Sequence, residues 1–156
     1  MLNLYITSGN KKDGKTFLTA GLAATMQSLG YNTSVYKPIQ TCGIEINGFT
    51  QSPDLTYIKT VDPYINTYFS YIFKSKSEPL IAAEAENEFI DIENIHNEYN
   101  RIAYSSDCTI IDGDRGYSMV SEFDSTSQFV KHYAYFASEP HYNNILSKYF
   151  SSYNIG

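Results

Sequence analysis

Eight consecutive residues near the N-terminus have the types and the spacing of a phosphate-binding loop. They fit the pattern G-x-x-x-x-G-K-[ST] and are Gly9, Asn10, Lys11, Lys12, Asp13, Gly14, Lys15 and Thr16. In such a loop, backbone N–H groups surround anionic oxygens, the lysine reaches the terminal phosphates, and the hydroxyl helps to hold Mg²⁺. The pattern therefore predicts that Lys15 binds a transferring phosphate and that Thr16 helps to bind Mg²⁺. The alternative is a glycine-rich turn that binds nothing, with Lys11 and Lys12 as a solvated loop tip.

Three further polar residues follow expected strands or the loops after them. Lys37 ends the second expected strand, Asp54 follows the next loop, and Asp112 follows a later apolar run. Ligands of open α/β sheets bind beyond the carboxyl ends of the strands. Phosphoryl transfer needs positive charge at the transferring group and carboxylates that hold a metal ion. We therefore predict Lys37 and Lys15 as catalytic cations, and Asp54 and Asp112 as metal ligands. The simpler alternatives are a solvated lysine, a helix cap and a turn residue.

The elements around the loop are those of a strand–helix–strand unit. The patterns predict a strand at 2–6, a helix at 17–29 that ends at Gly30, and a strand at 31–37 that ends before Pro38. The inward face of this helix is expected to consist of Leu18, Leu22, Met26 and Leu29. Such a unit is right-handed and leaves the loop at the carboxyl edge of a parallel sheet.

The rest of the chain is predicted to complete one domain. We expect a loop at 40–53, helices at 54–60 and 80–86, and a buried strand at 108–111. Between them, Asp91 is expected to cap a further helix, whose inward face consists of Ile92, Ile95, Tyr99 and Ile102. The aromatic-rich residues 61–76 are assigned no element, and Phe129-Val130 and Ile145-Leu146 are expected to anchor two helices. The fold class is therefore α/β, a P-loop NTPase-like three-layer domain with a mainly parallel sheet, spanning residues 1–156.

Composition and charge exclude several classes of protein. The net charge of −6 over 156 residues argues against nucleic acids and anionic membrane surfaces as partners. No apolar run has the length of a membrane span, and the N-terminus lacks a secretion signal, so we expect a cytoplasmic protein. Cys42 and Cys108 form no disulfide or metal framework, and His96, His132 and His141 lack the spacing of metal ligands.

Four motifs, in order and at similar spacing, resemble the dethiobiotin synthetase family over residues 2–119. Besides the loop, these are Lys37-Pro38-Ile39-Gln40-Thr41-Cys42-Gly43 against K-P-[IV]-x-[TS]-G, Ser52-Pro53-Asp54 against an S-D pair, Glu78-Pro79-Leu80-Ile81-Ala82-Ala83 against S-P-x-x-A-A, and Ile110-Ile111-Asp112-Gly113-Asp114-Arg115-Gly116 against V-E-G-A-G-G. The resemblance ends near residue 119. It implies that residues 120–156 are a divergent or shortened C-terminal part.

The resemblance implies an ATP-dependent ligase of biotin biosynthesis. In that family 7,8-diaminononanoate takes up CO₂ as a carbamate, ATP phosphorylates the carbamate, and the second amine closes a ureido ring. Carried over by position, Lys15 binds the transferring phosphate and Lys37 binds the carbamate. The remaining implied roles are metal binding by Thr16, Asp54 and Asp112, and substrate contacts by Thr41, Gly113 and Gly116. The implied cofactors are ATP and Mg²⁺, and the implied assembly is a homodimer.

Two departures from the family pattern motivate a second hypothesis. Asp13 replaces an apolar residue directly before Gly14, and Asp114 and Arg115 replace small residues. These changes are also compatible with a degenerate or regulatory ATP- and Mg²⁺-binding module that has no ligase activity. A partition-type ATPase is disfavoured because its loop carries a lysine where this chain has Asn10.

Overall fold

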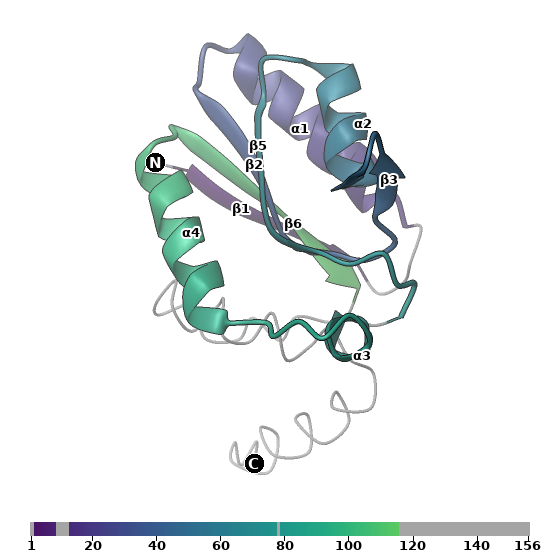
Figure 1. Cartoon of the computed structure of the whole chain (residues 1–156). Helices are drawn as coiled ribbons and strands as arrows, with labels where there is room; N and C mark the ends of the chain where they lie inside the picture. Colours follow the sequence, from purple (N-terminus) through teal and green to yellow (C-terminus); the bar gives the residue numbers. More distant parts are fainter. Residues whose placement is uncertain (1, 9–12, 78, 116–156) are drawn as a thin grey trace, which may run out of the picture.

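A parallel four-stranded sheet lies at the centre of the described part of the chain. The computed structural model describes residues 2–8, 13–77 and 79–115. The four strands of the sheet are β1 (Leu2–Ser8), β2 (Thr33–Gln40), β5 (Asn66–Ile72) and β6 (Cys108–Arg115). Their spatial order is β1-β6-β2-β5, and every pair of neighbours is parallel (Figure 1). The last of these strands in the chain therefore lies between the first two.

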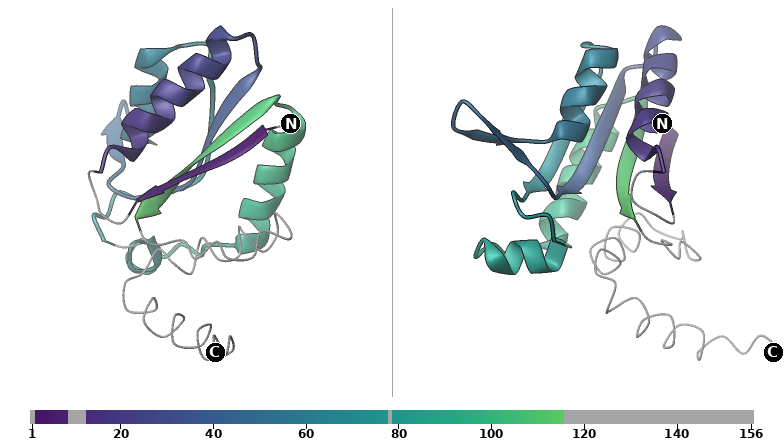
Figure 2. Two further views of the ribbon diagram at one scale, coloured as in Figure 1. Left: turned by 180° about the vertical axis from the view of Figure 1, so that it is seen from behind. Right: turned by 90° about the vertical axis from the view of Figure 1, so that its right-hand side faces the viewer.

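Helices cover both faces of this sheet (Figures 1 and 2). In the described part of the chain the helices are α1 (Lys15–Ser28), α2 (Pro53–Val61), α3 (Pro79–Ala85) and α4 (Ile92–Tyr104). One buried cluster joins α1 and α2 to the sheet through Ala20, Ala23, Val35, Leu55, Ile58, Ile65, Cys108 and Ile110. The other cluster lies on the side of α3 and α4 and includes Tyr36, Ile39, Ala82, Ala83, Ile95, Tyr99, Ile102 and Ile111. The predicted three-layer α/β architecture is confirmed.

Strand periodicity determines which polar groups reach the α1 side. Val35 and Ile110 pack in the cluster beneath α1 and α2, whereas their neighbours Tyr36 and Ile111 pack on the opposite face. Residues two apart in a strand share a face. Lys37 and Asp112, each two residues further along, therefore emerge beside α1.

Helix α1 ends as predicted, and the face that it presents to the sheet agrees with the predicted one only in part. Gly30 has φ +89°, and the N–H groups of Gly30 and Tyr31 donate to the carbonyls of Gln27 and Met26, which is a Schellman motif. Half of the predicted inward face is confirmed, because Leu22 and Met26 pack against the buried cluster, whereas Leu18 and Leu29 are 52% and 67% exposed. The fully buried residues are instead Thr19, Ala20 and Ala23. Their short side chains allow the helix axis to lie close to the sheet.

Strand β2 continues through Pro38, which corrects the predicted strand end. The pairing of β2 with β6 covers only Thr33 to Tyr36, while the pairing with β5 continues to Gln40. Pro38 therefore lies where one side of the strand has no ladder. A proline without an N–H group is tolerated at such an edge position.

The predicted loop at 40–53 contains a β-hairpin. Strands β3 (Ile44–Ile46) and β4 (Phe49–Gln51) pair antiparallel and stand away from the main sheet (Figure 2, right). Asn47 and Gly48 have φ values of +53° and +81°, as a two-residue type I′ turn requires. The Asn-Gly pair between apolar residues is the sequence signal for this turn, and the loop prediction overlooked it.

The remaining predicted elements are confirmed within the described residues. Helix α2 buries Leu55 and Ile58, α3 begins at Pro79, and α4 begins after its cap Asp91. Strand β5 arises in the segment to which no element was assigned. None of the helices in the described part of the chain has the length and apolar character of a membrane span. The expected helices around 129–130 and 145–146, with His132 and His141, lie outside the described residues.

Candidate active site

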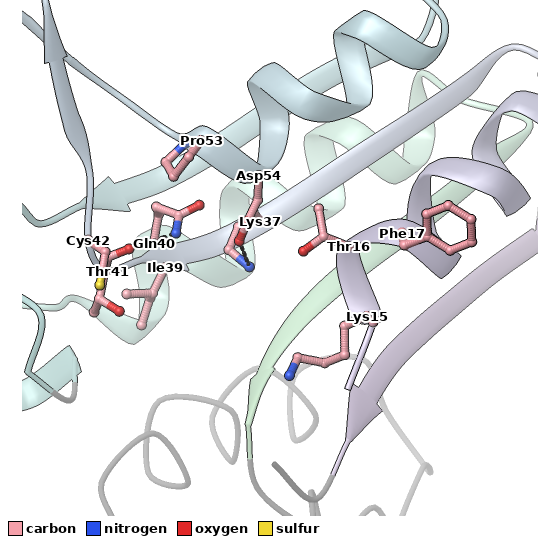
Figure 3. Close-up of a pocket in the computed structure, with 11 residues that line it drawn as sticks. Lys15, Thr16, Phe17, Lys37, Ile39, Gln40, Thr41, Cys42, Pro53 and Asp54 are labelled. Carbon is pink, nitrogen blue, oxygen red and sulfur yellow. Dashed lines mark hydrogen bonds and ion pairs between the residues drawn. The ribbon is translucent and has the colours of Figure 1, made fainter. Parts of the chain in front are cut away.

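A pocket of about 380 Å³ opens at the carboxyl ends of the strands, beside the N-terminus of α1. Its walls come from three segments: the start of α1, the end of β2 with the residues after it, and the start of α2. The lining residues are Gly14, Lys15, Thr16, Phe17, Lys37, Ile39, Gln40, Thr41, Cys42, Pro53 and Asp54 (Figure 3). Six of the predicted site residues line it: Gly14, Lys15, Thr16, Lys37, Thr41 and Asp54.

The N-terminus of α1 is suited to an anion. Its N-cap is Gly14, with φ +82° and no side chain that could accept a hydrogen bond from the first N–H groups. Exposed N–H groups and the helix dipole favour negative charge at such an end. Lys15 adds an ammonium whose Nζ donates to Ser8 Oγ over 2.8 Å. One wall of the pocket therefore carries the donors that a phosphate group needs.

The opposite side of the pocket holds a buried cluster of charges. Lys37 Nζ lies 2.9 Å from Asp54 Oδ2 and 3.0 Å from Asp112 Oδ2. The side chains of Lys37 and Asp112 are 6% and 0% exposed, whereas that of Asp54 is 30% exposed. Figure 3 shows the Lys37 ammonium directed at Asp54 and the Thr16 hydroxyl directed toward this pair, with Phe17 turned away.

Burial and the neighbouring charges shift the pKa values in this cluster. Burial raises the pKa of the Asp112 carboxyl, and the Lys37 ammonium offsets the shift only in part. Burial alone would lower the pKa of Lys37, but the carboxylates of Asp112 and Asp54 outweigh it and raise the pKa. Lys37 is therefore an ammonium at neutral pH. With one cation and two carboxylates, the cluster is a place for additional positive charge.

Two threonines of α1 hold Asp112 from the other side. Thr19 Oγ1 donates to Asp112 Oδ1 over 3.4 Å, and Thr16 Oγ1 lies 3.5 Å from Asp112 Oδ2. Thr19 was not among the predicted site residues. Its signal in the sequence is its position three residues after Thr16, which puts both hydroxyls on one helix face.

A second unpredicted network fixes the start of α2. Ser52 Oγ donates to Gln40 Oε1 over 2.5 Å and accepts the N–H of Leu55 over 3.1 Å, so Ser52 is the N-cap of α2. Gln40 Nε2 donates to the carbonyl of Thr41 over 2.7 Å. Since Asp54 lies in the first turn of α2, this network connects the end of β2 to the carboxylate that faces Lys37.

Of the remaining predicted site residues, some lie at the pocket and others lie away from it or outside the described part of the chain. Thr41 lines the pocket and is buried, whereas Gly113 is not among the lining residues. A Cβ at Gly113 would lie 2.5 Å from the hydroxyl oxygen of Tyr5, so this glycine makes room for an aromatic ring. Asp13 is exposed and directly precedes the pocket wall. The loop residues Gly9, Asn10, Lys11 and Lys12, and also Gly116, lie outside the described part of the chain.

The donor set at this site fits Mg²⁺ better than a softer metal. Thr16, Asp54 and Asp112 supply one hydroxyl and two carboxylates that converge on one region. Among the described residues, His, Cys, Asp and Glu form no group of three that could enclose a metal. Mg²⁺ is commonly held by one or two carboxylates together with substrate phosphates.

A parallel sheet, a G-x-x-x-x-G-K-[ST] loop between β1 and α1, and an acidic residue in the neighbouring strand β6 define a P-loop NTPase-like α/β domain. The family model described as "AAA domain" matches residues 2–132. The chain belongs to this family.

Curated relatives of the chain confirm the resemblance noted in the sequence. It is 28% identical over 118 residues to the ATP-dependent dethiobiotin synthetase of Clostridium botulinum (strain Alaska E43 / Type E3), which covers 72% of this chain and 51% of that protein. It is 27% identical over 128 residues to the ATP-dependent dethiobiotin synthetase of Brachyspira hyodysenteriae (strain ATCC 49526 / WA1). That match covers 80% of this chain and 56% of that protein. The chain spans about half the length of the curated relatives that it matches.

Proposed function

We propose that this protein acts as a dethiobiotin synthetase-like, ATP-dependent ligase in biotin biosynthesis. The observation that carries the proposal is the convergence of two lysines and two carboxylates at one pocket: Lys15 and Lys37 with Asp54 on its wall, and Asp112 bonded to Lys37. The names of the curated relatives support the choice of reaction.

The proposed reaction has three steps. One amine of 7,8-diaminononanoate adds to CO₂ and loses a proton, which gives a carbamate. A carbamate oxygen attacks the γ-phosphorus of ATP, and the bond from that phosphorus to the β,γ-bridging oxygen breaks to release ADP. The second amine then attacks the carbonyl carbon of this mixed anhydride, phosphate leaves with the electron pair of the C–O bond, and loss of a proton gives the cyclic urea.

Each group in the pocket has a role in this scheme. The N–H groups at the start of α1 and the Lys15 ammonium bind the phosphates and stabilise the charge that develops on the transferring group. Lys37 binds the carbamate oxygen, and Thr41 lies beside the substrate. Mg²⁺, when held by Thr16, Asp54 and Asp112, would neutralise charge on the phosphate oxygens.

The test is release of phosphate that depends on the diamine. Purified protein is incubated with ATP, Mg²⁺, bicarbonate and 7,8-diaminononanoate, and phosphate and the cyclic product are measured. We expect release that stops when the diamine is omitted, is lost in Lys15→Ala and is kept in the matched control Lys59→Ala, whose lysine is exposed and outside the pocket. No release above the Lys15→Ala level would reject the ligase. ATP-dependent thermal stabilisation without any effect of the diamine would then identify the nucleotide-binding module instead.

A further inference from the structure

The Lys37 ammonium lies between the two carboxylates that are proposed to hold Mg²⁺. Its Nζ contacts Asp54 Oδ2 at 2.9 Å and Asp112 Oδ2 at 3.0 Å. The Thr16 hydroxyl lies 3.5 Å from the same Asp112 oxygen. All three groups proposed to hold Mg²⁺ thus already surround, or lie beside, a positive charge supplied by the chain.

A divalent ion and this ammonium compete for the same two oxygens. Mg²⁺ binds carboxylate oxygens at about 2.0–2.1 Å, so an ion on Asp54 Oδ2 and Asp112 Oδ2 would lie against Lys37 Nζ if the lysine stayed in place. Repulsion between the two cations is strong because Lys37 and Asp112 are almost completely buried. Lys37 also lines the pocket, so its long side chain would have open space to enter if it left the two carboxylates.

We propose that Lys37 is an internal counter-cation of the metal site, and that a divalent cation binds only by displacing its ammonium from Asp54 and Asp112 into the pocket. Cation binding thereby makes Lys37 available to the anionic substrate, so the two ligands are coupled through one side chain. This inference builds on the proposed function, because it concerns the metal and the lysine of the same pocket. It adds the competition between them.

Metal affinity gives the first test, with Mn²⁺ as the probe and free Mn²⁺ measured by electron paramagnetic resonance. Lys37→Met should lower the Kd for Mn²⁺ by at least about tenfold, because it removes a buried charge next to the ion. Lys37→Arg keeps the charge and should stay near the wild-type Kd. The matched control is Lys74→Met, which also frees a carboxylate, that of Glu45, but at an exposed site. We expect no change in that variant.

The second test uses the wild-type chain and does not depend on a variant that folds. Lysines are acylated with and without saturating Mg²⁺, and labelling is quantified by mass spectrometry for Lys37, Lys59 and Lys74. Lys37 should be protected without Mg²⁺ and become labelled with it, whereas the two exposed lysines should not change. Three outcomes would overturn the proposal. Lys37 could stay protected at saturating Mg²⁺, the Kd for Mn²⁺ could be unchanged in Lys37→Met, or neither the wild type nor Lys37→Met could bind Mn²⁺.

The outcome can be separated from the fate of the ligase proposal. Tighter Mn²⁺ binding by Lys37→Met together with no diamine-dependent phosphate release would reject the ligase and keep the competition. Diamine-dependent phosphate release by the wild type, together with equal Mn²⁺ affinities of the wild type and Lys37→Met, would keep the ligase and reject the competition.

Discussion

Lys37 and Asp112 form an ion pair of 3.0 Å across the strands β2 and β6, with both side chains at most 6% exposed. The pair follows from the register of the parallel sheet, in which Tyr36 lies opposite Ile111. The next residue of each strand is therefore on the α1 side, where the two charges meet. The same two side chains therefore join neighbouring strands of the sheet and form part of the proposed active site.

Lys37 should make the folded state sensitive to alkali. Burial opposes the shift, but Asp112 and Asp54 raise the pKa of Lys37 above its ordinary value of 10.5. At high pH the unfolded chain then loses this proton before the folded chain does, so the free energy of unfolding falls as pH rises above 10.5. We expect the stability difference between wild type and Lys37→Met in urea unfolding to be full at about pH 8 and to shrink by about pH 12. A difference that stays constant over this range would contradict the charged pair.

Lys15 should be needed for nucleotide binding and not for folding. Its hydrogen bond to Ser8 lies in a half-buried place, and loss of such a bond in Lys15→Ala should change the free energy of unfolding by about 1 kcal/mol. Loss of the ammonium at a phosphate should weaken ATP binding by about tenfold or more. Isothermal titration with ATP and Mg²⁺ measures the affinity, and Lys59→Ala is the matched control. Equal affinities in the two variants would show that the loop does not bind phosphate through this lysine.

Ser52 should contribute more to stability than an ordinary surface serine. Ser52→Ala removes the cap of α2 and leaves Gln40 Oε1 without its donor in a buried place. Loss of an N-cap costs about 1 kcal/mol, and an unpaired buried acceptor adds about 1–3 kcal/mol. Urea unfolding should therefore show a loss of about 2–4 kcal/mol. Ser28→Ala, whose hydroxyl is exposed, should lose less than about 0.5 kcal/mol, and equal losses would argue against the network.

Two glycines should respond in opposite directions to the same added methyl group. A Cβ at Gly43 would lie 2.6 Å from Ile72 Cγ2 and 2.8 Å from Thr50 Cγ2, whereas a Cβ at Gly21 meets nothing within 4 Å. Gly43→Ala should cost about 1–3 kcal/mol through overpacking. Gly21→Ala, inside α1, should stabilise the protein by up to about 1 kcal/mol. Thermal unfolding of both variants tests this, and stabilisation by Gly43→Ala would mean that the hairpin does not pack against β5.

The structure brings Lys37, Asp54 and Asp112 together, whereas several elements around them differ from the predicted ones. Lys37, Asp54 and Asp112 could be expected to meet because parallel strands deliver their carboxyl ends to one edge. The ion pair itself could not be predicted, because it depends on the register between β2 and β6. Thr19 and Gln40 could not be predicted because a threonine within a helix and a glutamine at the end of a strand carry no motif of their own.

Predictions from the local sequence were wrong where packing against neighbouring elements determines the structure. Leu18 and Leu29 had the right spacing for a buried face, but the small side chains of Ala20 and Ala23 fit closer to the sheet. Pro38 normally ends a strand, yet β2 continues because β6 stops pairing before it. The Asn47-Gly48 turn differs from these two cases, because its signal lies in the local sequence itself.

The position of β6 between β1 and β2 affects how the chain can fold during its synthesis on the ribosome. At synthesis rates of about 5–20 residues per second, β1 and β2 are made several seconds before β6. During that interval the strand that separates them in the finished sheet does not exist, and their edges are open to wrong partners. Asp112 arrives with β6, so the nascent chain gains its central strand and its buried carboxylate in a single late event. Such long-range closure is slow, and the chain is therefore a candidate for assistance by chaperones while it is being made.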